Sequence, residues 1–248
     1  MESLEAELER ARELDVDELA DAIEAIGFEC TRCGACCKAE TCGDGGSDDG
    51  EESGDPHTAT VFPDEIRRLQ DAGDEAYDYR DVSVPTSPSV PSRDYRDVAR
   101  PMPYGLEEGP DGPEGETFEW ALQTDACGDC TFYAEDDAGT GACTVHDDRP
   151  LICRTYPFSV ALGGTSQPMG EAVDSEGMVR AHECEGLGRD ISRAEAEDLA
   201  GALKERAVRE LEEAIGVRDS YDPVETGRGE VVVHDSEGAK RPDGTPVE

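Results

Sequence analysis

The sequence predicts an α+β fold: a small helical, loop-rich domain that also contains a short antiparallel β-meander. Apolar residues recur at helical spacing near both ends of the chain, and they alternate with polar residues over residues 118–122. Only 36% of the 248 residues are hydrophobic and 5% are aromatic, so the core is thin for this length. The chain has ten cysteines, which can cross-link distant segments by binding metal. We therefore expect cysteine-bound metal to hold the fold together.

Helices are predicted in four places. Residues 3–26 form two short helices, with Asp15 capping the second and Gly27 ending it. A helix of roughly two turns begins at Pro63, where proline and acids suit a first turn. Asp148 caps a helix that ends at Tyr156, before Pro157. Ser192 caps a long helix whose apolar face carries leucines, and Gly216 ends it.

Short strands are predicted between these helices. Residues 58–61 form one strand, and Phe118, Trp120 and Leu122 alternate with polar residues as in a half-buried strand. Residues 131–133 and 142–146 flank a Gly- and Asp-rich turn. We expect these last three segments to form the antiparallel meander, which carries Cys127, Cys130 and Cys143.

The chain is expected to divide into three parts. Residues 1–27 form an N-terminal helix pair, residues 28–216 a cysteine-cluster domain, and residues 217–248 a mobile acidic tail. Two segments within the domain, residues 43–56 and 81–116, are rich in glycine or proline and are expected to be flexible, exposed insertions.

The charge of the chain limits its partners. A net charge of -39 and a pI near 4.2 predict repulsion from nucleic acid and from anionic membranes. Acids are spread over the whole sequence and lysine is rare, as in proteins adapted to molar salt, where charge repulsion is screened. The first residues lack a signal peptide and no apolar run could span a membrane, so we expect a cytoplasmic protein.

The first cysteine segment, residues 30–37, has the sequence Cys-Thr-Arg-Cys-Gly-Ala-Cys-Cys. A Cys-x-x-Cys-Gly turn directs two thiolates to one point, and Gly34 lets backbone N–H groups approach the sulfurs. Cys37 directly follows Cys36, and adjacent side chains diverge. This pair therefore indicates a second metal or a bridged cluster.

The cysteine pattern resembles that of the YkgJ-like cysteine-cluster family, a zinc- or iron-chelating domain with the signature CxxCxxCC. The signature is matched by Cys30, Cys33, Cys36 and Cys37. A second signature is matched by Cys143-Thr-Val-His, Arg149-Pro, Cys153-Arg and Tyr156-Pro-Phe, with Cys130 before it and Cys184-Glu-Gly after it. The resemblance covers residues 28–190 and implies eight metal ligands: Cys30, Cys33, Cys36, Cys37, Cys130, Cys143, Cys153 and Cys184.

Three positions depart from the family pattern or lie outside it. Cys42 and Cys127 are extra cysteines, and Glu185 stands where proline is usual. Cys127 belongs to a well-formed Cys-Gly-Asp-Cys turn and is a candidate to join the site, whereas Cys42 borders the acidic loop. In a reducing compartment, clustered cysteines are more often metal ligands than disulfides.

The metal stays open between zinc and iron. Eight thiols permit two four-thiolate sites, or one Fe-S cluster with one zinc. Cys30, Cys33 and Cys36 have the spacing of ferredoxin ligands, but no Cys-Pro follows at the fourth position. Four histidines could add nitrogen ligands, although we expect a surface or supporting role for each: His57, His146, His182 and His234. Four cations beside the cysteines could offset thiolate charge: Arg32, Lys38, Arg149 and Arg154.

Two classes of function fit these observations. A metal-binding module explains every cysteine without a substrate pocket, and we prefer it. The alternative is a redox or catalytic Fe-S protein, either an electron carrier or a methylase-related protein, since a related module occurs in a flagellin lysine methylase. No Gly-rich nucleotide loop follows a strand here, and no catalytic residue is indicated. We expect a protein or small-molecule partner, whose identity the sequence does not give, and the oligomeric state is likewise not indicated.

Overall fold

The structure is a computed structural model, which describes residues 2–39, 56–72, 92–165 and 172–247. Its architecture is α+β, as predicted. The helices are α1 (Leu4–Glu13), α2 (Val16–Ile26), α3 (Pro63–Asp71), α4 (Tyr95–Val98), α5 (Leu151–Thr155) and α6 (Arg193–Ser220). The strands are β1 (Thr60–Val61), β2 (Ala99–Pro101), β3 (Leu106–Gly109), β4 (Gly112–Thr117), β5 (Trp120–Leu122), β6 (Tyr133–Glu135), β7 (Gly141–Cys143), β8 (Phe158–Val160), β9 (Ala172–Asp174), β10 (Val179–His182), β11 (Val231–Asp235) and β12 (Gly238–Lys240).

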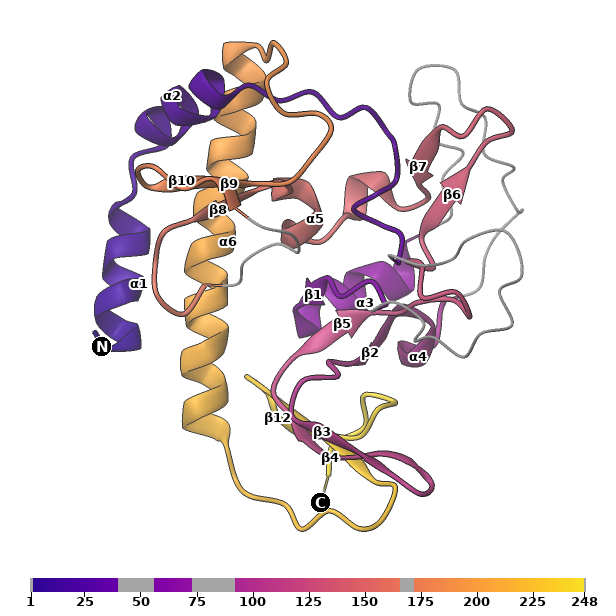
Figure 1. The fold of residues 1–248 in the computed structure, drawn as a ribbon. Coiled ribbons are helices and arrows are strands. Elements are labelled where there is room, and N and C mark those ends of the chain that lie inside the picture. Colours follow the sequence, from indigo (N-terminus) through magenta and orange to yellow (C-terminus); the bar gives the residue numbers. More distant parts are fainter. Residues whose placement is uncertain (1, 40–55, 73–91, 166–171, 248) are drawn as a thin grey trace.

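One hydrophobic core lies around α6. Helices α1 and α2 pack on one side of α6, and the sheet β8-β10-β9 packs beside them (Figure 1). Ile23, Phe158, Leu203 and Leu211 are fully buried in this core. Each such side chain contributes about 1.5–3 kcal/mol by leaving water. The predicted caps are confirmed: Asp15 accepts from two backbone N–H groups at the start of α2, and Gly27 adopts a left-handed conformation at its end.

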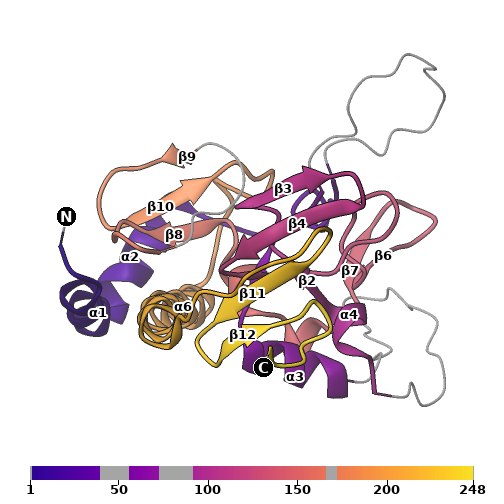
Figure 2. The ribbon, with the colours of Figure 1, turned by 90° about the horizontal axis from the view of Figure 1, so that it is seen from below.

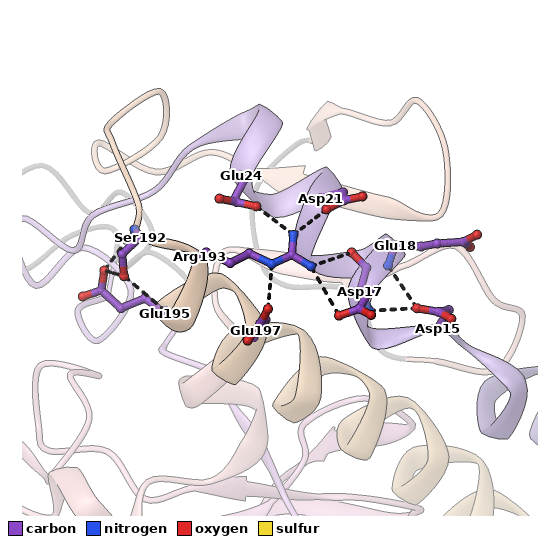
Figure 3. A network of polar contacts seen from close by, with 9 residues as sticks. All are labelled: Asp15, Asp17, Glu18, Asp21, Glu24, Ser192, Arg193, Glu195 and Glu197. Carbon is purple, nitrogen blue, oxygen red and sulfur yellow. Dashed lines mark hydrogen bonds and ion pairs between the residues drawn. The ribbon is translucent and has the colours of Figure 1, made fainter.

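Charged residues reinforce the contact between α2 and α6. Ser192 and Glu195 form a capping box at the start of α6, as the sequence predicted for Ser192. Arg193 then reaches across to carboxylates of α2 and to Glu197 on its own helix (Figure 3). Because this guanidinium is exposed, the contacts add less to stability than the buried core does.

A buried arginine joins α6 to the segment that follows the second cysteine signature. Arg206 is 2% exposed, and its guanidinium donates to Glu210 at 2.9 Å, to the Thr155 hydroxyl at 3.0 Å and to the Phe158 carbonyl at 3.1 Å. A buried cation requires such partners to offset lost hydration. Arg206 therefore fixes the end of α5 and the start of β8 against α6.

A second core lies between α3 and the sheet β1-β5-β2. Central strand β5 pairs with β1 on one side and β2 on the other, so all three of its residues are buried. Ile66 and Leu69 of α3 pack against Trp120 and Leu122. Phe118, expected to be half-buried on this strand, is instead 47% exposed and precedes it.

The expected meander is only partly present. β6 and β7 form a hairpin, with Tyr133 opposite Cys143, but β5 belongs to a different sheet. A single bridge between Thr124 and Cys130 links the two regions. The cause is that β5 is fully buried between β1 and β2, which leaves it no free edge for β6.

Two segments expected to lack regular structure join in one sheet. Residues 217–248 were predicted to be a mobile tail, and residues 81–116 to be an irregular insertion. Instead β11 and β12 follow α6, and the sheet has the order β12-β11-β4-β3, with β11 parallel to β4 (Figure 2). The buried Val232 and Val233 supply the reason, because β11 covers apolar area that a free tail would expose. The part of the predicted insertions within residues 43–55 and 81–91 lies outside the described residues.

Two helix boundaries also differ from prediction. α6 continues through Gly216 to Ser220; a β-carbon at Gly216 would lie 2.6 Å from that of Ser236, so the glycine permits close packing rather than ending the helix. α5 begins at Leu151, capped by Pro150, and Asp148 lies in a separate 3-10 turn, His146–Asp148. Arg149 is extended because the following proline disfavours a helical conformation there. α5 ends at Thr155, one residue before the predicted end at Tyr156, which is its C-cap.

Candidate metal centre

Eight of the nine cysteines in the described residues are free thiols. They are the eight cysteines that the family resemblance implied as metal ligands: Cys30, Cys33, Cys36, Cys37, Cys130, Cys143, Cys153 and Cys184. We call this set the cysteine cluster. Cys127 is disulfide-bonded, so the expectation of a ligand rather than a disulfide is wrong for this residue. Cys42 lies outside the described residues.

The first cysteine segment is held as a tight turn by two left-handed residues, Arg32 with φ 62° and Gly34 with φ 78°. The N–H groups of Cys37 and Lys38 both donate to the Gly34 carbonyl, at 2.8 and 3.1 Å. The turn brings the sulfurs of Cys36 and Cys37 to 3.8 Å from each other. The expectation that these adjacent side chains diverge is therefore wrong.

Tyr133 covers this turn from the β6–β7 hairpin. A β-carbon on Gly34 would overlap the Tyr133 ring, so only glycine fits below it. The Tyr133 hydroxyl donates to Glu135 at 2.6 Å, and the Lys38 ammonium lies 5.2 Å from the ring centroid and pairs with Glu135. Sequence reasoning assigned Tyr133 only to a strand, because no local pattern shows that a distant aromatic covers Gly34.

Backbone hydrogen bonds tie the first segment to the hairpin that carries Cys130 and Cys143. The Cys130 N–H donates to the Cys37 carbonyl at 2.8 Å. Arg32 and Gly141 exchange two bonds: the Gly141 N–H donates to the Arg32 carbonyl at 2.8 Å, and the Arg32 Nε donates to the Gly141 carbonyl at 2.9 Å. These backbone bonds and the Arg32 side-chain bond join segments that lie about a hundred residues apart in the sequence.

The closing cysteine, Cys184, is tied to the opposite end of the first segment. Glu29 donates its N–H to the Gly186 carbonyl at 3.0 Å, and Phe28 forms a β-bridge with Leu187. A β-carbon on Gly186 would overlap the Glu29 carbonyl, so this glycine permits the close approach. The segment carrying Cys184 is also tied to the end of α5, because the His182 N–H donates to the Pro157 carbonyl at 3.0 Å.

The cluster separates into two groups by burial and by the effects of the thiols on one another's pKa values. The inner group packs against the second hydrophobic core and comprises Cys37, Cys130, Cys143 and Cys153. The outer group includes three exposed thiols and one half-buried thiol: Cys30, Cys33, Cys36 and Cys184. Burial raises the pKa of Cys153, and nearby Cys130 and Cys143 raise it further. Burial likewise raises the pKa of Cys184, with added effects from Cys36, Cys33 and Cys30. The thiols that raise each pKa therefore belong mainly to the same group as the affected thiol. Cys36, a member of the outer group, acts on thiols of both groups.

Four thiols receive a backbone N–H from the residue two positions later. The Gly186 N–H donates to the Cys184 sulfur at 3.4 Å. Burial raises the pKa values of Cys130 and Cys143, and partial desolvation raises that of the exposed Cys30. The N–H groups of Phe132, Val145 and Arg32 respectively oppose that rise. An N–H directed at sulfur stabilises the thiolate over the thiol. The same local geometry thus recurs in three separate segments of the cluster.

The contact between Cys36 and Cys37 shifts the pKa values of the two thiols in opposite directions. The Cys37 thiol stabilises the Cys36 thiolate and lowers the pKa of Cys36 to about 7, whereas the pKa of Cys37 is raised by the same contact and by burial. Arg149 also favours ionised thiols, because its positive charge lowers the pKa values of Cys36 and Cys143 against the other effects. A single cation therefore acts on both groups.

The other cations and the histidines have different surroundings. Lys38 pairs with Glu135, and Arg154 is exposed. His182 is buried and shares a hydrogen bond with the Ser159 hydroxyl at 3.1 Å, while His234 contacts Glu116 at 2.8 Å. His57 is buried, its backbone carbonyl accepts a hydrogen bond from the Arg100 guanidinium at 2.9 Å, and burial lowers the pKa of its imidazole to about 4. His146 contacts Asp147 beside the cluster.

The donor set fits zinc or iron in its chemistry. Within the described ranges, no three Cys, His, Asp or Glu side chains converge closely enough to form a finished ligand set. The cluster nevertheless gathers eight free thiols, and soft thiolates are the ligands that zinc and iron-sulfur centres select. The inner and outer groups each supply four, the number that a tetrahedral centre needs.

One of three comparisons with known proteins gave a match, and that match contains the cysteine cluster. No curated protein and no solved structure matched the chain. Among the described helices, none combines the length and the hydrophobicity that a membrane span requires. Residues 29–185 match the CxxCxxCC family, described as a putative zinc- or iron-chelating domain, and this range contains the whole cysteine cluster. The chain therefore belongs to the CxxCxxCC family of zinc- or iron-chelating domains.

Proposed function

We propose that the protein binds zinc or iron through the thiolates of the cysteine cluster, in a salt-adapted cytoplasm, and that the metal knits the fold together. One observation carries the proposal: the eight family cysteines are the free thiols, and backbone bonds bring their segments to one region. The inner and outer groups are the two ligand sets. Cys36, which neighbours both, is the thiol best placed to bridge them.

A structural role is preferred for the inner group. Its four thiols come from the first segment, the β6–β7 hairpin and α5, and they pack within the second core. A metal bound there would cross-link segments that share a thin apolar core, and its binding energy would add to folding energy. Arg149 would offset part of the negative charge of the thiolates.

The exposure of the outer group favours a second candidate. Cys30, Cys33 and Cys36 are exposed, so an iron-sulfur centre held by the outer group would lie at the surface, where electrons can pass to a partner. The protein would then be an electron carrier or part of a catalytic system. In either case the net charge of -39 would repel nucleic acid and anionic membranes, so we expect other partners.

Metal analysis of protein purified without oxygen in molar potassium chloride tests the proposal. Zinc or iron bound in stoichiometric amount, together with protection of most free thiols from a thiol reagent, supports it. A colourless sample with zinc indicates the structural role, and a brown sample that bleaches with dithionite indicates the iron-sulfur candidate. Metal-free protein with all eight thiols reactive would contradict both.

A further inference from the structure

A cavity of about 400 Å³ lies where the second core meets α6, and none of the cysteine cluster lines it. Its volume is within the range typical of small-molecule sites. The metal-binding proposal makes no use of this cavity. Its lining combines a buried apolar floor, exposed aromatic rings and several carboxylates, and these features restrict the kind of ligand that fits.

The floor and the rim are apolar. Phe62, Met102 and Trp120 line the cavity and are buried, whereas Tyr104 and Phe118 line it with 68% and 47% of their surface exposed. The two exposed rings therefore lie at its solvent-facing edge. Phe118 is held in place by a stack on His234, with ring centroids 5.5 Å apart. Such rings bind apolar groups and, through their faces, cations.

Three glutamates line the same cavity, and among the described residues one of them, Glu119, has neither a side-chain hydrogen bond nor an ion pair. Glu210 pairs with Arg206 at 2.9 Å, and Glu213 accepts the Ser236 N–H at 2.8 Å. The Glu119 side chain is exposed, and its carboxylate has no side-chain hydrogen bond or ion pair within the described part of the chain. Partial desolvation of this carboxylate, together with the charges of Glu210 and Glu213, raises its pKa. Arg218, the cation at the edge, is paired with Glu5 at 2.6 Å. A positive ligand would therefore meet an unpaired carboxylate.

The apolar lining separates this cavity from ordinary acidic surface. Acid-rich surface is expected everywhere in a chain with 61 acidic residues, and carboxylates alone would attract any cation. A small hydrated metal ion gains nothing from Phe62, Trp120 or the exposed rings, because it prefers oxygen ligands and water. A ligand with an ammonium group on an apolar body can place the ammonium group against the carboxylates and the body against the apolar side chains.

We propose that this cavity binds an organic cation, a protonated amine carried on an apolar body, with the ammonium group at Glu119 and the body against Trp120. The rings of Tyr104 and Phe118 flank the entrance. The site is independent of the cysteine cluster, so it would exist whichever metal the cluster holds.

The single tryptophan gives a direct readout, because Trp120 lines the cavity and is the only tryptophan in the chain. Full-length protein is titrated with phenethylammonium chloride in molar potassium chloride while Trp120 fluorescence is recorded. We expect a saturable change with phenethylammonium, and binding at least tenfold weaker with the neutral isostere 2-phenylethanol, because a hydrogen bond to a charged group contributes about 1.5–3 kcal/mol.

Charge-matched variants test the assignment to Glu119. Glu119→Gln is expected to weaken phenethylammonium binding on the order of tenfold. Glu108→Gln, on exposed β3, changes the net charge equally and should leave binding unchanged. Tyr104→Ala removes an exposed ring and should weaken binding a few-fold. Equal binding of amine and alcohol, equal effects of the two glutamine variants, displacement by magnesium chloride at the same concentration, or no saturation would each overturn the proposal.

Discussion

The ring of Tyr133 occupies the space that a side chain on Gly34 would need. Gly34→Ala therefore meets two costs: a left-handed φ of 78° that alanine disfavours by about 1–2 kcal/mol, and the overlap with Tyr133. We expect a lower thermal midpoint and less bound metal, measured by calorimetry and elemental analysis.

Gly139 supplies the control for that variant. Its φ is 80°, it lies in the β6–β7 turn, and a β-carbon there meets nothing within 4 Å. Gly139→Ala therefore carries the backbone strain without the overlap. If both alanine variants lose the same stability and the same metal, Tyr133 does not constrain the first cysteine segment.

The inner and outer groups should respond differently to loss of one thiol. Cys153→Ser removes an inner ligand within the second core, and it should lower both metal content and the thermal midpoint strongly. Cys33→Ser removes an exposed outer ligand; it should lower metal content with a smaller loss of stability, confined to part of the domain. Elemental analysis and thermal denaturation of both variants measure the difference.

Cys127→Ser is the matched control, because Cys127 is disulfide-bonded and is not a member of the cysteine cluster. Its metal content should equal that of the unmodified protein. Unchanged metal content in both Cys33→Ser and Cys153→Ser would instead show that the cluster is not the ligand set.

The buried pair Arg206 and Glu210 should be costly to break. Arg206→Met removes the guanidinium that donates to Glu210 and to the Phe158 carbonyl, and loss of one partner of a buried pair costs about 3–5 kcal/mol. Chemical denaturation measures this free energy of unfolding. Adding Glu210→Gln should recover part of the loss, because it removes the uncompensated charge. A loss of less than about 1 kcal/mol in the single variant would show that the contact resembles a surface pair.

Stability should fall as pH decreases through the titration range of His57. Burial, assisted by Arg100, lowers the pKa of folded His57 to about 4, against about 6.5 when unfolded. Between these values the unfolded state binds the extra proton. The favourable contribution is therefore complete above pH 6.5 and is lost towards pH 4, by up to about 3 kcal/mol.

His57→Gln isolates this effect, since carboxyls such as Glu65, whose pKa is raised by burial, contribute with the opposite sign. The difference in unfolding free energy between the two proteins should change across pH 4 to 6.5. A constant difference over this range would show that His57 protonates equally in both states.

The parts of the fold that could be predicted depend on local signals. α2 lies between a capping Asp15 and a left-handed Gly27, and both signals are adjacent to the helix that they bound. β11 pairs in parallel with β4, more than a hundred residues earlier. The three valines of β11 favour a strand, but neither sequence indicates with which strand it pairs. The same limit explains Gly216, whose packing partner Ser236 follows in a distant turn.

The site shows the same division. Spacing and family resemblance identified the eight free thiols in advance. Their partition into inner and outer groups depends on which thiols the second core buries, and the cover of Gly34 depends on the position of Tyr133 across the hairpin. The disulfide at Cys127 was not predictable from its turn, because a Cys-Gly-Asp-Cys sequence suits a metal equally well.

X-ray absorption at the metal edge of the purified protein tests the central claim most directly, because it counts the atoms bound to the metal. We expect a first shell of about four sulfur atoms at about 2.3 Å, reduced in Cys153→Ser and unchanged in Cys127→Ser. A first shell of oxygen and nitrogen without sulfur would contradict the assignment of the cysteine cluster as the metal centre.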